Sequence, residues 1–334
     1  MTELVSILIP AYNAERWIGA TIESALAQTW PAKEIIVVDD GSTDRTLAIA
    51  RAFGDRGVRV VPQVNRGAAA ARNSALRAAR GSYIQFLDAD DLLHPRKIAA
   101  QLRGAEDGRR SRVLLTCRWG RFFVRPEQAR FAPDALWQDL SPADWLFTKF
   151  HDNRFMFPAS WLVSRRLVDD AGPWNEDLSL DDDGEYMCRL VAASQQVRFM
   201  PDAECYYRIG NSGSLSSQRS DRAVRSGFAS MRLCIERLLL LEDSERTRHA
   251  CVRLLQDNLS HFYPEKADLV DQSRRLARKL GGDLTPPGER FHFMLFRGIF
   301  GWRTAKLLRS MLNDAKLRTR RWVDGLGRVD ARTN

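Results

Sequence analysis

The sequence YIQFLDADD at residues 83–91 decides the fold that we expect for this chain. Its apolar first half has the length of a buried strand, and the run ends in three carboxylates. Ionised carboxylates so close together repel one another and need a cation or solvent to coexist. Asp88 and Asp90 share a face on an extended backbone, so both can reach one hard cation, which would in turn hold a phosphate. The alternative is an acidic loop tip after an edge strand.

Strands and helices alternate on the N-terminal side of this stretch. Apolar runs predict strands over residues 4–9, 34–40 and 59–61, and helical periodicity predicts helices over residues 17–28, 47–53 and 68–79. This alternation is typical of an α/β fold with a doubly wound, mostly parallel sheet, which binds ligands at the carboxyl ends of its strands. Polar residues stand at three of these ends, so we expect them to line one crevice.

The remainder of the chain is less regular. Residues 103–130 are rich in Arg and aromatic side chains, with one expected strand over residues 113–116. We expect a short helix over residues 134–150, a strand over 155–163, a helix over 186–193 and a strand over 197–200. From about residue 222 the pattern is helical nearly to the end, with interruptions at prolines.

Composition and charge narrow the class of protein. Of the 334 residues, 44% are apolar, which is enough for a hydrophobic core. Residues 225–334 hold 22 basic and 13 acidic side chains, which accounts for the whole net charge of +9. Five scattered cysteines without a Cys-x-x-Cys spacing favour free thiols in a reducing compartment. Neither a signal peptide nor a membrane-spanning run is evident, so we expect a cytoplasmic protein.

Four motifs, in this order, resemble the family-2 glycosyltransferases, which have the GT-A fold. They are VSILIPAYN at residues 5–13, EIIVVDDGSTD at 34–44, NRG at 65–67 leading to ARN at 71–73, and LDADD at 87–91. The likeness is close over residues 4–100 and extends loosely to about residue 217. It implies a GT-A catalytic domain over residues 1–220, with a nucleotide-binding half (1–102) and an acceptor half (103–220), followed by a helical, basic region (221–334).

The resemblance implies a donor site at the strand ends. Its residues are Pro10, Tyr12, Asn13, Asp39, Asp40, Arg72 and Asp88. A tyrosine ring can stack on a base, and a carboxylate can accept a hydrogen bond from a pyrimidine N–H or a ribose hydroxyl. For the two aspartates at residues 39–40 the alternative is a helix cap, and for Tyr12 it is a core aromatic. Arg72 is either a phosphate clamp or part of a solvated helix face.

The acidic sequence DDDGEYMCR at residues 181–189 resembles the part of the family pattern that holds the catalytic base. The resemblance places the base at Asp183, with Asp182 in place of the usual Glu and Asp181 as a further candidate. A carboxylate within hydrogen-bond reach can take the proton of a sugar hydroxyl as the new bond forms. The alternative is an acidic helix N-terminus, which the helix dipole favours. Trp174 is a candidate acceptor-binding residue or a core aromatic.

Arg208 and the residues at 214–216 resemble the closing loop of the family. Many members carry a His two residues after this Arg, where the present chain has Gly210. The metal ligands are therefore expected to be Asp88 and Asp90, for Mg²⁺ or Mn²⁺, and the sequence does not identify a third. Arg208 or backbone amides of the loop are alternatives for holding the diphosphate.

Residues 291–312 mix aromatic and aliphatic with basic side chains. Such a segment can lie peripherally in a membrane interface or pack on the catalytic domain with its basic groups in water. Nucleic-acid binding is disfavoured, because no binding module is recognisable and the crevice is acidic.

Together these features predict a glycosyltransferase, and the family resemblance implies that it inverts the configuration of the transferred sugar. It moves a sugar from a nucleotide-diphosphate donor, expected to be a UDP-sugar, to a hydroxyl of a glycan or lipid-linked acceptor in cell-surface polysaccharide synthesis. The alternatives are a sugar nucleotidyltransferase, for which the Gly-rich basic loop after the first strand is missing, a dinucleotide-binding oxidoreductase, for which the Gly-x-Gly-x-x-Gly turn is missing, and a non-catalytic nucleotide- or carbohydrate-binding homologue.

Overall fold

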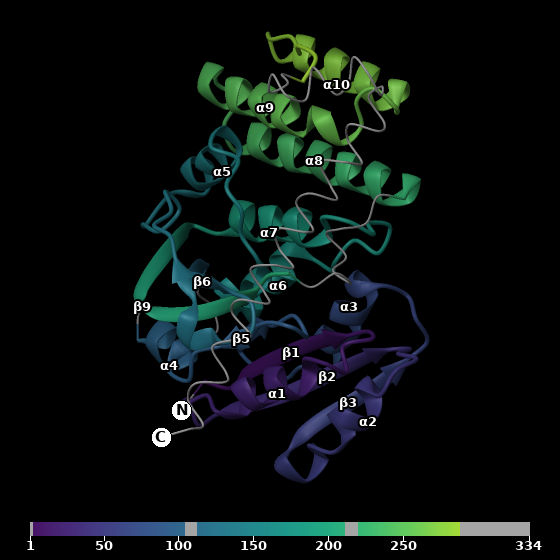
Figure 1. Cartoon of the computed structure of the whole chain (residues 1–334). Helices are drawn as coiled ribbons and strands as arrows, with labels where there is room; N and C mark the ends of the chain where they lie inside the picture. Colours follow the sequence, from purple (N-terminus) through teal and green to yellow (C-terminus); the bar gives the residue numbers. More distant parts are fainter. Residues whose placement is uncertain (1–2, 104–111, 211–219, 288–334) are drawn as a thin grey trace, which may run out of the picture.

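The computed structural model describes residues 3–103, 112–210 and 220–287. A five-stranded sheet forms the base of the molecule (Figure 1), with the strand order β3-β2-β1-β4-β8. Its strands are β1 (Val5–Ala11), β2 (Lys33–Asp40), β3 (Val58–Gln63), β4 (Tyr83–Phe86) and β8 (Val163–Ser164). The first four are parallel to one another and β8 is antiparallel to β4.

Alternation along the strands gives this sheet two buried faces. Ile7 and Val37 face one side and pack with α1 (Ile18–Leu26) and α2 (Thr46–Arg51). Leu8 and Phe86 face the other side and pack with α3 (Ala68–Ala78), α6 (Arg165–Ala171) and α7 (Asp182–Ala193). Side chains of successive residues point to opposite faces of a strand, so a continuous apolar run is what a doubly covered sheet requires.

A smaller second sheet has the order β5-β9-β6-β7. Its strands are β5 (Leu92–Leu93), β6 (Val113–Phe122), β7 (Arg130–Phe131) and β9 (Gln196–Arg208), and α4 (Lys97–Leu102) packs on β9. The pairing of β5 with β9 brings Leu92 opposite Tyr206. This contact places the end of the acidic stretch next to residues that come more than 100 positions later in the chain.

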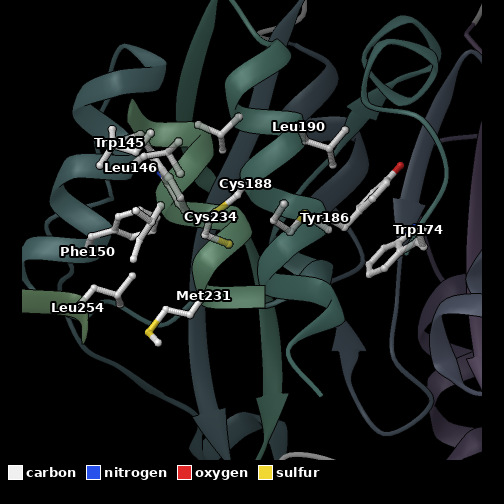
Figure 2. Close-up of a cluster of buried hydrophobic side chains, with 14 of the residues drawn as sticks. Trp145, Leu146, Phe150, Trp174, Tyr186, Cys188, Leu190, Met231, Cys234 and Leu254 are labelled. Carbon is white, nitrogen blue, oxygen red and sulfur yellow. The ribbon is translucent and has the colours of Figure 1, made fainter. Parts of the chain in front are cut away.

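The helices α5 (Pro142–His151), α8 (Asp221–Leu241), α9 (Glu245–Asn258) and α10 (Ala267–Lys279) form a layer beyond α7 (Figure 1). Side chains of α5, α7, α8 and α9 share one apolar cluster (Figure 2), which contains Trp145, Tyr186, Met231 and Leu254. The C-terminal helices therefore pack onto the domain through a continuous core.

The predicted fold class is confirmed, whereas several element boundaries were wrong. Residues 134–141 are not helical, because α5 begins only after Ser141, whose hydroxyl accepts a hydrogen bond from the N–H of Asp144. The expected strand over residues 155–163 is mostly irregular: a single 3-10 turn, Pro158–Ser160, precedes the two-residue strand β8. The strand expected at 197–200 is part of the longer β9, and α7 begins four residues earlier than expected, at Asp182.

Candidate functional site

A cavity of about 880 Å³ opens where β1, β2 and β4 end. Described residues that come from distant parts of the sequence line it together. Those that the sequence predicted are Pro10, Tyr12, Asn13, Asp40, Arg72, Asp88, Asp90, Asp182 and Asp183. Parallel pairing sets this arrangement, since Ala11 lies opposite Asp39 and Leu8 opposite Phe86, so the strand ends align. The expectation that these ends meet at one crevice is confirmed.

The ring of Tyr12 is 51% exposed at this cavity, so the alternative of a core aromatic is wrong. Asn13 follows with a φ of +47°, and its side-chain Oδ1 accepts a hydrogen bond of 2.8 Å from the N–H of Thr43. Asn tolerates this left-handed conformation better than most residues. The loops after β1 and β2 therefore brace one another beside the exposed ring.

Asp40 holds the loop that leads into α3. Its carboxylate accepts hydrogen bonds from the side chain of Gln63 at 2.7 Å and from the N–H groups of Arg66 at 2.9 Å and Gly67 at 2.8 Å. The helix-cap alternative thus describes Asp40 in part, although the helix is α3 and not α2. Gly41 makes the turn possible, because a Cβ there would lie 2.8 Å from the backbone nitrogen of Asn65.

Asp39 lies behind Asp40 and is not among the described residues that line the cavity. One carboxylate oxygen accepts a hydrogen bond of 3.2 Å from the N–H of Ser42. The other oxygen is buried and has no hydrogen-bond partner in the described part of the chain. A buried acceptor without a partner is costly, which is consistent with an oxygen that a ligand N–H or hydroxyl satisfies. At the start of α2 it is instead Asp44 whose carboxylate accepts a hydrogen bond from the N–H of Thr46.

Arg72 connects the two acidic parts of the cavity. Its guanidinium donates to Asp88 at 2.8 Å and to Asp182 at 2.7 Å, and the residue is only 5% exposed. The solvated-face alternative is therefore wrong. Both flanking carboxylates hold the guanidinium in its charged form and raise its pKa, against burial, which lowers it. Because charge-assisted bonds of this length are strong, Arg72 fixes Asp182 relative to the end of β4.

Trp174 lies in the core and not on the cavity wall. It is 2% exposed, its ring stacks on Tyr186 with centroids 4.1 Å apart (Figure 2), and the Arg72 guanidinium lies 4.5 Å from its centroid. Asn73 accepts a hydrogen bond from the N–H of Trp174 and donates one to its carbonyl. With its ring covered in this way, Trp174 offers no face on which an acceptor can stack. It supports Arg72 instead.

Of the aspartates at residues 181–183, Asp183 is half-buried and forms no ion pair with a described cation. Asp182, by contrast, is paired with Arg72. Burial raises the pKa of Asp183 to about 7, with further contributions from Asp182 and Asp181 and opposition from Arg72. A carboxyl that titrates near neutral pH suits a general base. Asp181 precedes the helix with a φ of +60°, and its carboxylate accepts from the hydroxyl of Ser230 on α8 at 2.6 Å.

The turn that follows β4 is held from two sides. The hydroxyl of Thr21 donates to the carbonyl of Ala89 at 2.8 Å. Arg208 donates from Nε to the carbonyl of Asp90 and from its backbone N–H to the carboxylate of Asp91, each at 2.8 Å. Arg208 is 5% exposed and also packs against Trp17, so it positions this turn and does not face the cavity.

A divalent cation fits the donor chemistry of this turn in part. Asp88 and Asp90 line the cavity, and carboxylate oxygens are the ligands that Mg²⁺ and Mn²⁺ prefer. Within the described residues no group of three or more His, Cys, Asp or Glu side chains could hold a metal ion. The two aspartates would therefore hold a cation together with oxygens from a bound diphosphate. Of the expected closing loop, residues 214–216 lie outside the described residues.

Sequence reasoning missed the opposite wall of the cavity. It consists of the end of α5, the loop that follows it, and parts of α8, α9 and the 3-10 turn Leu259–His261. Its lining residues include Lys149, Arg154, Phe155, Met231 and His261. In the sequence, the Arg-and-aromatic composition was noted for residues 103–130 and not for the residues of this wall.

Comparison with known proteins identifies the family. The family model described as glycosyl transferase family 2 matches residues 6–172, which is half of the chain. The chain belongs to glycosyl transferase family 2. The matched residues include the strand ends, Arg72 and the acidic turn after β4, whereas the cavity lining after residue 172 lies outside the match.

The alignments of this chain with curated relatives span only part of each sequence. The UDP-Glc:alpha-D-GlcNAc-diphosphoundecaprenol beta-1,3-glucosyltransferase WfaP of Escherichia coli is 49% identical over 105 residues, 31% of this chain and 42% of WfaP. The uncharacterized glycosyltransferase EpsJ of Bacillus subtilis is 30% identical over 221 residues, 62% of each chain. The chain thus spans less than two thirds of the length of these curated relatives.

Among solved structures, that of S. aureus TarS 1–349 in complex with UDP-GlcNAc superposes with a TM-score of 0.66 at 19% identity, over 83% of this chain and 82% of that one. This likeness shows the GT-A fold.

All five cysteines are buried and free, as the sequence predicted. In the part of the chain that the structure describes, no helix is long and apolar enough to cross a membrane. The expected interfacial segment, residues 291–312, lies outside the described residues.

Proposed function

We propose that this family-2 chain is an inverting glycosyltransferase that uses a nucleotide-diphosphate sugar, with UDP as the nucleotide. One observation carries the proposal: Tyr12, Asp40, Asp88 and Asp183 line a single cavity although they come from four separate segments. The names of two similar proteins agree, since WfaP uses UDP-Glc and TarS was crystallised with UDP-GlcNAc. The acceptor of WfaP is lipid-linked, which supports a hydroxyl acceptor in cell-surface glycan synthesis for this chain.

The nucleoside is bound at the ends of β1 and β2. Tyr12 stacks on the base, and Pro10 and Asn13 form the floor and rim beside it. The unpartnered oxygen of Asp39 accepts a hydrogen bond from the base or the ribose, and Asp40 keeps the surrounding loop in place. Asp88 and Asp90 would hold a divalent cation, which would supply positive charge toward the diphosphate of the donor.

Asp183 takes the proton of the acceptor hydroxyl in this mechanism. As that proton moves to a carboxylate oxygen, the hydroxyl oxygen forms a bond to the anomeric carbon on the face opposite the diphosphate. The anomeric carbon–oxygen bond to the diphosphate breaks, its electron pair leaves with the nucleoside diphosphate, and the configuration is inverted. Arg72 holds Asp182 and opposes the rise in the pKa of Asp183, so that with a pKa of about 7 a substantial fraction of Asp183 is ionised at neutral pH.

A thermal-shift screen of UDP, GDP and CDP with Mn²⁺ tests the donor half of the proposal. We expect UDP to stabilise the protein most, because ligands that bind only the folded state raise the melting temperature. Transfer with a panel of nucleotide sugars, with and without EDTA, then tests the reaction. Pyrophosphate release from a nucleoside triphosphate would instead favour a nucleotidyltransferase, and full activity of Asp90→Ala in EDTA would exclude a role for the cation.

The domain boundaries and the cellular location remain part of this proposal. We propose that residues 1–220 form the catalytic domain and that the helices after residue 221 complete its acceptor side, since α8 and α9 contribute to the cavity lining. We also propose a cytoplasmic location for the enzyme.

A further inference from the structure

The cavity wall that faces the donor side carries two cations with incomplete partners. Lys149 is at the end of α5 and Arg154 is in the loop that follows, and both are half-buried and line the cavity. The Lys149 Nζ donates to a backbone carbonyl, that of Arg154, at a long 3.4 Å. No described carboxylate lies within 4.0 Å of this ammonium.

Arg154 is paired as loosely. Its guanidinium lies 3.4 Å from Asp152 and 4.0 Å from Asp134, and its Nε is buried without a hydrogen-bond partner in the described part of the chain. Strong pairs of guanidinium and carboxylate are closer, at about 2.7–2.9 Å, as Arg72 and Asp182 are at 2.7 Å. A buried donor without a partner carries a free-energy cost that a bound anion removes.

The backbone directs these two cations to the cavity. Asn153, between α5 and Arg154, has a φ of +47°, a conformation that few residues adopt and that turns the chain back after the helix. The charge of Lys149 reaches Asp181, where it opposes the raised pKa of that carboxyl. Lys149 is thus near the acidic residues 181–183, and Arg154, whose carbonyl accepts its hydrogen bond, lies beside it.

The surroundings of the two cations combine ring and hydrocarbon surfaces. Phe155, next to Arg154, is 40% exposed and packs against Tyr207 with centroids 5.1 Å apart; both rings line the cavity. Apolar side chains of the C-terminal helices line the same part, among them Phe228, Met231 and Leu254. An aromatic ring can stack on the face of a sugar, and the apolar side chains of the helices can pack against a hydrocarbon chain.

We propose that Lys149 and Arg154 form a phosphate-binding subsite for the acceptor, so that this enzyme glycosylates a sugar that carries a phosphate or diphosphate. The proposal rests on the proposed function, which supplies the donor and the base. The acceptor sugar lies between Asp183 and Phe155, and its phosphate lies between the two cations. An alkyl chain on the phosphate would continue along α8 and α9.

Binding of decyl diphosphate, measured by calorimetry in buffer with EDTA and no added metal, tests the subsite directly. Without a cation the acidic donor side repels anions, so this measurement does not depend on the donor site. We expect the wild type to bind with one site, and Lys149→Met/Arg154→Met to bind at least about tenfold more weakly. Lys149→Arg should retain most of the affinity.

Two further ligands and a control pair complete the test. Inorganic pyrophosphate reports whether the diphosphate is recognised without an alkyl chain. Decyl maltoside reports binding of the apolar part alone, and its affinity should be the same in the wild type and in Lys149→Met/Arg154→Met. Arg166→Met/Arg232→Met removes two exposed charges elsewhere and should bind decyl diphosphate like the wild type. Equal binding by both double variants, or no diphosphate binding by the wild type, overturns the proposal. Failure of UDP to bind would instead count against the proposed function.

Discussion

The two sides of the cavity are built in different ways. On the donor side, Asp40 accepts a hydrogen bond from the loop before α3, and Asp91 accepts one from the end of β9. On the acceptor side, Lys149 and Arg154 are poorly paired and come from a helix end and a loop. The donor side is therefore largely set before a ligand binds, with the buried oxygen of Asp39 as an exception, whereas the acceptor side has two cations that a ligand can satisfy.

This difference has a physical reason. A nucleotide diphosphate presents the same groups in every donor, so a fixed arrangement at the strand ends suits it. An acceptor differs between enzymes, and helices packed on the sheet can change without disturbing the strand ends. Asp183 and Arg72 lie between the two sides, and variants of these residues are expected to have the largest effects.

Asp183→Asn tests whether the reaction depends on the acid between the two sides. We expect kcat to fall by about 10²- to 10⁴-fold, the range for a lost general base, while UDP affinity changes little. Transfer assays and UDP titration measure the two quantities. Asp177→Asn removes an exposed acid from the preceding loop and serves as the control. Equal activity of the two variants would assign the base elsewhere, with Asp182 and Asp181 as the remaining candidates.

The pH dependence of the wild type sharpens this prediction. With a pKa of about 7, Asp183 is protonated in acid, so kcat/KM should fall about tenfold per pH unit below 7 and level off above it. An unfolded Asp ionises near 3.8. The stability that this group contributes is therefore complete below that pH and is lost as the pH rises through 7. Asp183→Asn should be more stable than the wild type at pH 8, measured by thermal unfolding.

Arg72→Met tests the connection between the sides. Asp88 and Asp182 would both lose their buried cation, and breaking such a pair costs about 3–5 kcal/mol in free energy of unfolding. Urea unfolding measures the loss. Arg77→Met on the same helix removes an exposed arginine and should cost less than about 0.5 kcal/mol.

A second result of Arg72→Met separates its electrostatic role from its structural one. Because Arg72 lowers the pKa of Asp183, the acidic limb of the pH profile should move to higher pH in this variant. Arg72→Lys should restore part of that shift. If the acidic limb of the pH profile stays in place while the free energy of unfolding falls strongly, Arg72 only supports the fold.

The sequence predicted the donor side well because its signals are local. An apolar run followed by Asp or Asn marks a strand end within a few residues, and parallel pairing then aligns such ends. Asp88, Asp40 and Tyr12 were found in this way and line the cavity. The roles of Asp40 and Arg72 were less clear, since their side-chain partners lie 16 to 110 positions away in the chain.

The acceptor side was predicted poorly for a related reason. The apolar run at residues 155–163 has strand character, but it is buried between elements that periodicity does not reveal, and Pro158 begins a 3-10 turn there. The sequence Ser141-Pro142 contains a helix-start signal, a cap followed by proline at the first position, which would have corrected the start of α5. Nothing local indicates that Lys149 faces Asp181; tertiary packing decides it.

Tyr12→Ala tests the donor side alone. Stacking on an aromatic ring is worth about 1–3 kcal/mol per base, so UDP affinity should fall by about one order of magnitude, while the free energy of unfolding stays nearly unchanged because the ring is exposed. Fluorescence titration with UDP measures the affinity. Val64→Ala removes another exposed apolar side chain and should leave it unchanged. Undiminished UDP binding by Tyr12→Ala would move the base to another part of the cavity.

Ser141→Ala tests whether the acceptor side can be weakened separately. The hydroxyl of Ser141 caps α5, which ends at Lys149 and the loop with Arg154. Loss of such a cap costs about 1 kcal/mol, and urea unfolding should show this loss, whereas Ser141→Asn, which keeps a capping oxygen, should show little. UDP affinity should be the same in all three proteins, because no residue of α5 lies at the donor strand ends. If Ser141→Ala weakened UDP binding as well, the two sides would form one cooperative unit, and the separation between a fixed donor side and a variable acceptor side would be wrong.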